Sequence, residues 1–149
     1  MRLRKVKKAD DIIASSSYFI NNPSDYIGKW NELFGNNNPL YIEIGMGKGN
    51  FLKEMALKHP NINFVGIEKY SSVIVRAVQK MDEVELPNVK LICVDALLLP
   101  TIFSKEVDTI FLNFSDPWPK ERHAKRRLTS DIFLNIYDKL FKDKKRKIG

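Results

Sequence analysis

Three acidic residues lie at or near the ends of apolar runs, where they could bind a small ligand. Glu43 is next to last in the apolar run LYIEI, Glu68 ends NFVGIE, and Asp95 ends LICVD. A carboxylate in such a place can accept hydrogen bonds from the hydroxyl or amino groups of a ligand. Glu68 could instead be a solvent-facing charge, and Asp95 could simply cap a following helix. The three acids together indicate a binding edge more strongly than any one alone.

A glycine-rich turn, IGMGKG, follows Glu43 directly. Glycines allow a tight turn and a close backbone approach to a ligand, which makes Gly45 and Gly47 candidate cofactor contacts. A dinucleotide site has Gly-x-Gly-x-x-Gly with pyrophosphate at the helix N-terminus, but here Gly49 comes one position early. Glu43 would also repel pyrophosphate and attract an ammonium group. S-adenosylmethionine has an amino-acid end and no phosphate, so the pattern favours it over NAD, although a purely structural turn remains an alternative.

The other two acids fit the rest of such a cofactor. Glu68 lies 19 residues beyond Gly49, a spacing at which a strand-end carboxylate accepts hydrogen bonds from ribose hydroxyls. Asp95 can accept from the exocyclic amine of adenine, with Ala96 behind the ring. We therefore expect an adenosyl pocket without a phosphate site.

A stiff turn with a carboxylate and an aromatic ring, NFSDPWPK, spans residues 113–120. Two prolines flank Trp118, so the turn could hold Asp116 beside the methyl group of the cofactor. A plain proline-rich loop with Trp118 in the core is the alternative. The basic run KERHAKRR follows at once and could neutralise several phosphates. Its cationic residues are Lys120, Arg122, Lys125, Arg126 and Arg127.

Alternating apolar strands and amphipathic helices must position these residues, and they predict a parallel sheet with helices on both faces. Ligands of such sheets bind beyond the carboxyl ends of the strands, where the acids and glycines fall. We expect residues 1–23 to have little regular structure, and Ser24 or Asp25 to cap the first helix. The expected strands are 40–44, 62–67, 88–94 and 107–114, and the expected helices are 24–34, 48–58, 71–82, 96–103 and 128–141.

The net charge of +7 is unevenly distributed along the 149 residues. Residues 2–8 carry +5, residues 120–127 carry +4 and residues 142–147 carry +4, so the remainder is close to −6. Three basic clusters on an acidic body favour a polyanion partner, although solvated surface charge is the alternative. The segments 1–38, a basic arm with a short helix, and 39–149, a cofactor-binding domain, are the expected divisions.

Other classes of function are disfavoured by the composition. The chain has one cysteine, Cys93, which we expect to be a small core residue, and its two histidines are far apart in sequence, so we expect no metal site. No run approaches a membrane span, and the N-terminus lacks the apolar stretch of a signal peptide. A reducing, cytoplasmic setting fits these features.

These segments, in this order, resemble the bacterial tRNA (guanine-N7)-methyltransferase family. The likeness is carried by IEIGMGKGNF, VGIEKYSSVIVRAVQK and LNFSDPWPKERHAKRRLT, and it extends from about residue 1 to residue 141. The resemblance implies a Rossmann-like class I S-adenosylmethionine-dependent methyltransferase fold, with tRNA as substrate. It also implies cofactor contacts at Glu43, Glu68, Asp95 and Asp116. Asp116 would be the catalytic residue and Lys120 an RNA contact.

The last part of the family pattern is not found in this sequence. A Thr-Asp-Asn segment and a later Thr-x-Tyr-Glu segment should follow residue 141, but the chain ends in KDKKRKIG. We therefore expect a C-terminally truncated chain without the final strands, which has little methyltransferase activity alone. The full-length family is expected to be monomeric or homodimeric, whereas this chain should self-associate. Three rivals remain open: a nucleic-acid amino-group methyltransferase, a non-catalytic RNA- or cofactor-binding remnant, and, most weakly, a dehydrogenase.

Overall fold

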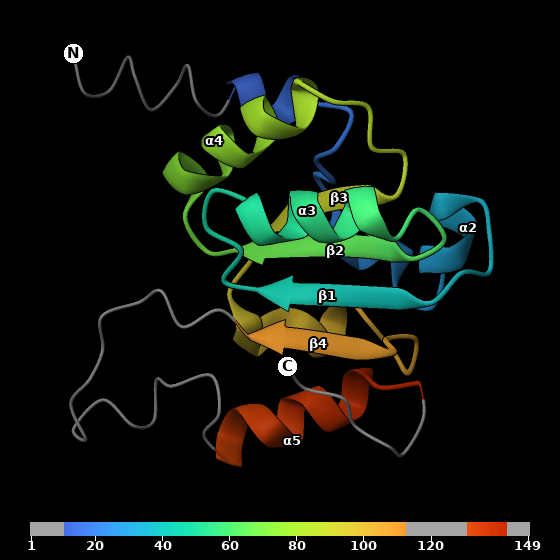
Figure 1. Cartoon of the computed structure of the whole chain (residues 1–149). Coiled ribbons are helices and arrows are strands. Elements are labelled where there is room, and N and C mark those ends of the chain that lie inside the picture. Colours follow the sequence, from blue (N-terminus) through green and yellow to red (C-terminus); the bar gives the residue numbers. More distant parts are fainter. Residues whose placement is uncertain (1–10, 113–130, 143–149) are drawn as a thin grey trace.

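The computed structural model describes residues 11–112 and 131–142 (Figure 1). One parallel sheet has the strand order β3-β2-β1-β4. Its strands are β1 (Leu40–Ile44), β2 (Asn63–Glu68), β3 (Val89–Cys93) and β4 (Thr109–Leu112). The helices are η1 (Pro23–Tyr26), α2 (Trp30–Phe34), α3 (Asn50–Lys58), α4 (Ser71–Asp82), η2 (Ala96–Thr101) and α5 (Asp131–Leu140). The predicted α/β class is confirmed.

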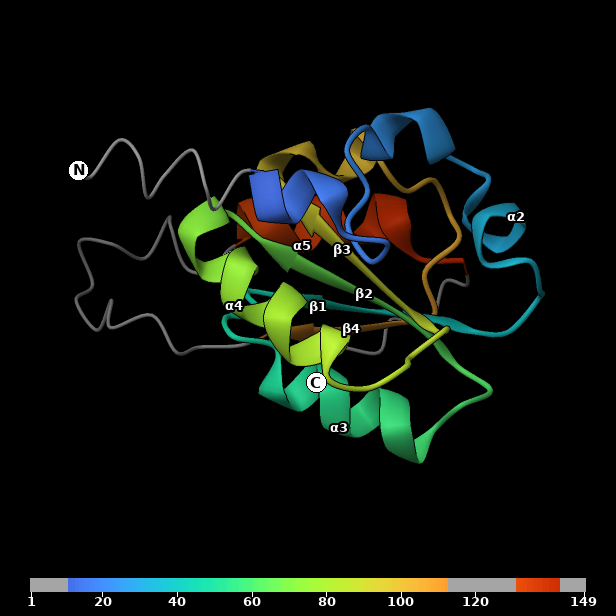
Figure 2. The same ribbon diagram turned by 90° about the horizontal axis from the view of Figure 1, so that it is seen from above.

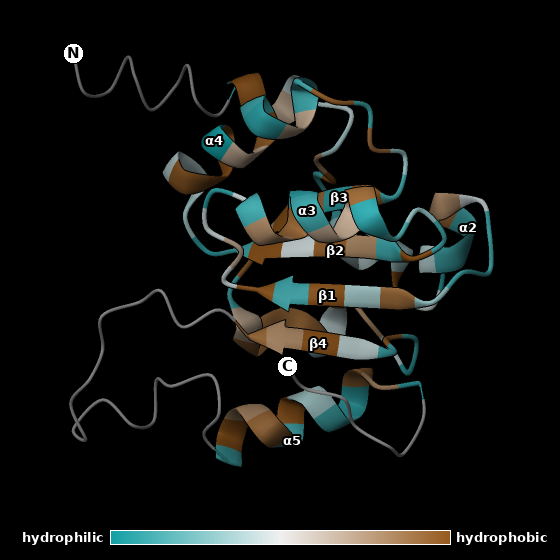
Figure 3. Cartoon of the chain, in the orientation of Figure 1, coloured by the Kyte–Doolittle hydropathy of each residue, from teal (hydrophilic) through white to brown (hydrophobic). Residues whose placement is uncertain are grey.

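Helices cover both faces of this sheet, as Figure 2 shows from above. Helices α3 and α4 enclose one core with β2 and β3, in which Leu52, Ile74 and Leu91 are buried. The other core lies between the sheet and α2, η2 and α5, and Trp30 and Tyr137 are fully buried in it. Because the strands are covered on both faces, most of their residues are apolar, although Figure 3 also shows hydrophilic segments in β1 and β2.

The helix expected over residues 24–34 is two separate elements. Gly28 has φ +74° and separates η1 from α2, and its N–H donates to the Glu106 carboxylate at 2.7 Å. The same carboxylate accepts from the N–H groups of Trp30 at 3.2 Å and Ser104 at 2.9 Å. The expected cap at Ser24 or Asp25 is also wrong, since η1 begins after Asn22 without a side-chain cap. A partner 78 residues away fixes this break.

Residues 11–23 are more ordered than we expected, and residues 1–10 lie outside the described residues. Residues 11–15 are helical, and Ile13 is buried in the α3–α4 core. Phe19 bridges Leu91 of β3 in parallel, with Ile20 N–H donating to Leu91 O and Leu91 N–H donating to Tyr18 O. The outer edge of β3 is thereby paired. The sequence concealed this because the run SSSYFI has few of the apolar alternations that mark a strand.

Strand β4 lies at the other edge of the four-stranded sheet. Val107, just before it, pairs with the end of α5, since Val107 N–H donates to Leu140 O and Val107 O accepts from Lys142 N–H. Asp108 N–H points inward to Leu40 O. Backbone groups alternate in direction along a strand, so those of Thr109 and Phe111 face outward like those of Val107. Within the described ranges no hydrogen bond covers them.

Two apolar residues are less buried than those of the two cores. Phe51 of α3 is 39% exposed and contacts Phe111 edge-on with ring centroids 5.1 Å apart. Cys93, expected in the core, is only partly buried. The first residues of the helix expected over 128–141, residues 128–130, lie outside the described residues. None of the described helices is long and apolar enough to cross a membrane.

Candidate active site

The three acids all lie at the carboxyl-terminal edge of the sheet, where the strands end, as predicted. Strands β1, β2 and β3 are adjacent and parallel, with Ile44 beside Ile67 and Glu68 beside Cys93. Glu43 is next to last in β1, Glu68 is last in β2, and Asp95 comes two residues after β3. Their carboxylates are therefore carried by three neighbouring strand ends, which is where a ligand of a parallel sheet binds.

Glu43 is the buried member of this set, with 2% of its surface exposed. It lies between Gly66 of β2 and Phe111 of β4 in the strand register. A charged side chain is rarely buried to this degree unless it has a specific partner or function. It comes directly before the glycine turn, in the strand that leads into the loop between β1 and α3.

The glycine loop is a tight turn with left-handed backbone at Gly45 (φ +77°), Gly47 (φ +57°) and Gly49 (φ +82°). A side chain at Gly49 would also meet Ala77 Cβ at 3.2 Å and Met81 Cε at 3.1 Å, so glycine lets α3 start close to α4. At Gly47 a Cβ would meet nothing within 4 Å. The loop needs glycine for its backbone, as predicted, and at Gly49 also for packing.

The amide groups of this loop are bonded to β2. Gly45 N–H and Met46 N–H both donate to Ile67 O, at 2.8 and 3.1 Å. Gly47 N–H donates to Glu68 Oε1 at 3.1 Å. A phosphate-binding loop presents such N–H groups to the ligand. Here the three N–H groups bond instead to the protein, two to a carbonyl oxygen and one to a carboxylate. This arrangement disfavours the binding of an anion in the turn.

Glu68 also accepts hydrogen bonds from the backbone of the two residues that follow it. Its Oε2 accepts from Lys69 N–H at 3.0 Å and from Tyr70 N–H at 3.3 Å. These bonds turn the backbone after β2 toward the start of α4. The ribose role expected for Glu68 remains a prediction.

Asp95 has the capping role that was left open from sequence. Its Oδ1 accepts from Leu97 N–H at 3.0 Å and caps η2. Its Oδ2 lies 3.6 Å from Lys69 Nζ, in an ion pair whose side chains are 59% and 38% exposed. A cap uses only one of the oxygens, so contact with adenine is compatible with it but stays a prediction.

Two features of this edge were missed from sequence. Lys69 links the ends of β2 and β3 through Asp95, and its Nζ lies 5.7 Å from the centre of the Tyr70 ring. A Lys-Tyr pair directly after a strand-end acid was the available signal. Gly66 was also overlooked, although an isolated glycine within a strand often marks close packing.

The remaining predicted site residues lie outside the described residues. They are Asp116, Lys120, Arg122, Lys125, Arg126 and Arg127. Within the described ranges, no group of three or more His, Cys, Asp or Glu side chains could hold a metal.

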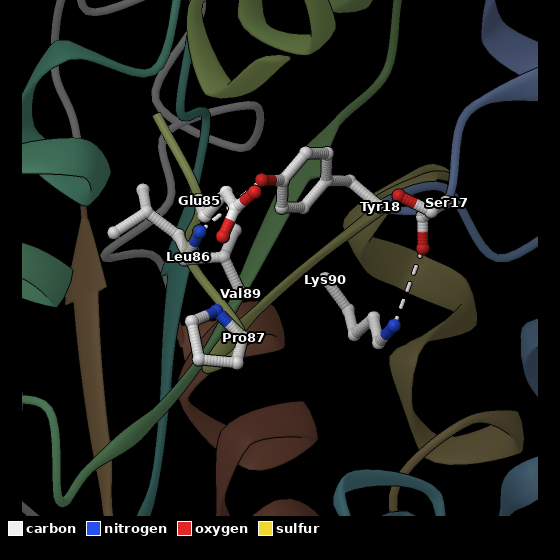
Figure 4. A pocket seen from close by; sticks show the side chains of 7 residues that line it. All are labelled: Ser17, Tyr18, Glu85, Leu86, Pro87, Val89 and Lys90. Carbon is white, nitrogen blue, oxygen red and sulfur yellow. Dashed lines mark hydrogen bonds between the residues drawn. The ribbon is translucent and has the colours of Figure 1, made fainter. Parts of the chain in front are cut away.

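A pocket of about 270 Å³ lies away from this edge (Figure 4). Its lining includes Val89, the first residue of β3, so the pocket lies at the opposite end of that strand from Asp95. Tyr18 Oη accepts from Leu86 N–H at 3.2 Å, and Lys90 Nζ donates to Ser17 O at 3.2 Å. Burial lowers the pKa of the Lys90 ammonium. These contacts hold the N-terminal segment onto the sheet edge, so the pocket belongs to the packing of that segment.

A family model described as "Putative methyltransferase" matches residues 37–145. The chain is 54% identical over 145 residues to a tRNA (guanine-N(7)-)-methyltransferase of Lachnoclostridium phytofermentans, covering 96% of this chain and 68% of that protein. It is 52% identical over 142 residues to the protein of the same name in Bacillus subtilis, covering 94% of this chain and 67% of that one. The chain thus spans about two thirds of the length of these relatives.

Solved structures with a similar fold are methyltransferases of other kinds. One, described as an antibiotic-related methyltransferase, has a TM-score of 0.61 at 22% identity and covers 76% of this chain and 57% of that one. Another, PKMT2 from Rickettsia typhi in complex with AdoHcy, has a TM-score of 0.57 at 20% identity and covers 84% of this chain and 24% of that one. At these identities the likeness concerns the fold.

Proposed function

This chain belongs to the tRNA (guanine-N(7)-)-methyltransferase family, and we propose that it is the cofactor-binding and methyl-transfer part of such an enzyme. The methyl donor is S-adenosylmethionine and the acceptor is N7 of a guanine in tRNA. We assign cofactor binding to residues 39–149 and RNA contact to the basic run 2–8, since Ile13, Ile20 and Trp30 of the expected arm are buried in the two cores. Because tRNA is the substrate, the reaction takes place in the cytoplasm.

The observation that carries this proposal is the glycine loop with its amide groups bonded to β2. Gly45 and Met46 donate to Ile67 O and Gly47 donates to Glu68, so the loop offers no phosphate cradle. A carboxylate-lined edge of this kind suits a ligand with an ammonium group, ribose hydroxyls and an adenine amine. This match favours S-adenosylmethionine over a dinucleotide. It also disfavours the hypothesis that the protein is a dehydrogenase.

Each acid has a proposed role at this edge. Glu43, with the backbone of Gly45 and Gly47, faces the amino-acid end of the cofactor. Glu68 accepts from the ribose, and Asp95 accepts from the adenine amine through the oxygen that now pairs with Lys69. Cofactor binding therefore competes with this exposed ion pair, whose strength is small.

The chemistry asks little of the protein beyond positioning. S-adenosylmethionine supplies an electrophilic methyl group on a sulfonium. Guanine N7 already has an in-plane lone pair, so no residue must remove a proton. We assign to Asp116 the orientation of guanine, by accepting from its N1–H or exocyclic amine, and the stabilisation of the cationic product by its charge.

The basic run after Asp116 is the proposed RNA contact. Its side chains are Lys120, Arg122, Lys125, Arg126 and Arg127. They neutralise phosphates and hold the tRNA while the target base leaves its stack. Trp118 offers a ring on which that base could stack.

A product assay tests the function. The 149-residue chain and a relative of full family length are incubated with unmodified tRNA and S-adenosylmethionine carrying a labelled methyl group, and the nucleosides are then separated. We expect label in N7-methylguanosine for the longer protein. Label in N6-methyladenosine would instead support an amino-group methyltransferase. For the 149-residue chain, calorimetric binding of the cofactor without turnover would support the non-catalytic remnant.

A further inference from the structure

Glu68 already has three hydrogen-bond donors within the protein. Its Oε1 accepts from Gly47 N–H, and its Oε2 accepts from the N–H groups of Lys69 and Tyr70. A carboxylate offers about four lone-pair sites. Three are occupied, so one further donor fits, and a second would have to replace one of these bonds. A residue whose sole task is to meet a ribose would not need a bond to the glycine loop.

Gly47 is the point of the loop that packing does not hold. Gly45 and Met46 are tied to the backbone of β2 through Ile67 O. Gly49 lies against α4. At Gly47, by contrast, the space where a side chain would lie is open to 4 Å, and its N–H bonds to the Glu68 side chain.

We propose that Glu68 is a positioning residue, which holds the glycine loop in its binding shape through Gly47 before the cofactor arrives. The inference rests on the proposed function and deepens it. Glu68 then contributes to cofactor affinity by two routes, the ribose and the loop. A loop fixed in advance loses less conformational freedom on binding, so the affinity for the amino-acid end of the ligand also depends on Glu68.

A ligand without ribose hydroxyls separates the two routes. S-adenosylhomocysteine and its 2′,3′-dideoxy analogue are titrated calorimetrically into the 149-residue chain and into Glu68→Ala. We expect Glu68→Ala to weaken binding of the dideoxy analogue about tenfold, as for the loss of one hydrogen bond to a charged acceptor. Equal affinity of both proteins for the dideoxy analogue would overturn the proposal and leave Glu68 a ribose contact only.

Glu68→Gln provides the conservative comparison. Its amide oxygen can still accept from Gly47 N–H, whereas its amide nitrogen cannot accept from Lys69 or Tyr70. We expect Glu68→Gln to bind the dideoxy analogue more tightly than Glu68→Ala does. Equal weakening in both variants would contradict the role of Gly47.

Amide hydrogen exchange without ligand gives an independent measurement. The Gly47 amide should exchange faster in Glu68→Ala than in the unsubstituted chain, while Asp95→Ala, which removes the neighbouring strand-end acid, should leave it unchanged. Unaltered Gly47 exchange in Glu68→Ala would overturn the proposal. If the unsubstituted chain binds neither ligand, the cofactor assignment fails first, and the exchange data still decide whether Glu68 holds the loop.

Discussion

Gly66 occupies a position in β2 where even one added carbon has no room. A Cβ there would overlap Met46 Sδ and would lie 2.8 Å from Leu52 Cδ2 and 3.0 Å from Leu91 Cδ2. These atoms belong to the glycine loop, α3 and β3. The absence of a side chain at Gly66 therefore lets the loop lie directly on the sheet.

The expected cost of Gly66→Ala follows from these contacts. Inserting a methyl group into a well-packed core costs about 1–3 kcal/mol. Alanine in a strand recovers about 0.5–1 kcal/mol relative to glycine, because the unfolded chain is less free. We expect a net loss of up to about 2.5 kcal/mol in the free energy of unfolding. The affinity for S-adenosylhomocysteine should fall as well, because Met46 lies between Gly45 and Gly47.

Urea unfolding of four proteins measures this: the unsubstituted chain, Gly66→Ala, Met46→Ala and the double variant. Met46→Ala alone should cost about 2–5 kcal/mol. In the double variant the new methyl group fills part of the space left by Met46, so the combined loss should be smaller than the sum. Gly35→Ala is the matched control, because an alanine there is strained by the backbone φ of +77° but meets no neighbouring atom within 4 Å. Its loss of unfolding free energy should therefore add to that of Met46→Ala. Additive losses for Gly66 and Met46 would refute the steric argument.

Three further outcomes are expected. Binding of tRNA should weaken steeply with salt, and reversing the charges of Arg126 and Arg127 should flatten the slope of log affinity against log salt; an unchanged slope would place the RNA elsewhere. In a version extended to the length of the relatives, Asp116→Asn should lose most turnover while cofactor affinity falls less, and a near-normal single-turnover rate would make Asp116 a structural residue. The outward backbone groups of Thr109 and Phe111 should let the 149-residue chain self-associate through β4, and sedimentation showing a monomer at every concentration would contradict this.

Features set by neighbouring residues could be predicted from the sequence. The alternation of apolar strands and amphipathic helices predicted the parallel sheet, and strand-end positions alone brought Glu43, Glu68 and Asp95 to one edge. The left-handed glycines followed from the same turn. In each case the residue type and its spacing along the chain contain the physical cause.

Features set by partners far away in sequence could not be predicted. The helix break at Gly28 depends on a carboxylate 78 residues later, and the bond from Gly47 to Glu68 spans 21 residues. Lys69 was not singled out because its partner Asp95 ends another strand. Glu106, which joins three backbone N–H groups, looks in the sequence like an ordinary surface charge.

The burial of Trp30 has a consequence for the order of events during synthesis. Its indole N–H donates to Ile102 O at 2.8 Å, and its ring stacks on Phe103 with centroids 4.8 Å apart. The hydrogen-bond acceptor lies 72 residues downstream. At about 5–20 residues per second, a ribosome needs about 4–15 s to make that stretch. For this interval the nascent chain carries an unsheltered tryptophan, and α2 can settle only after β1, β2 and β3 have been translated.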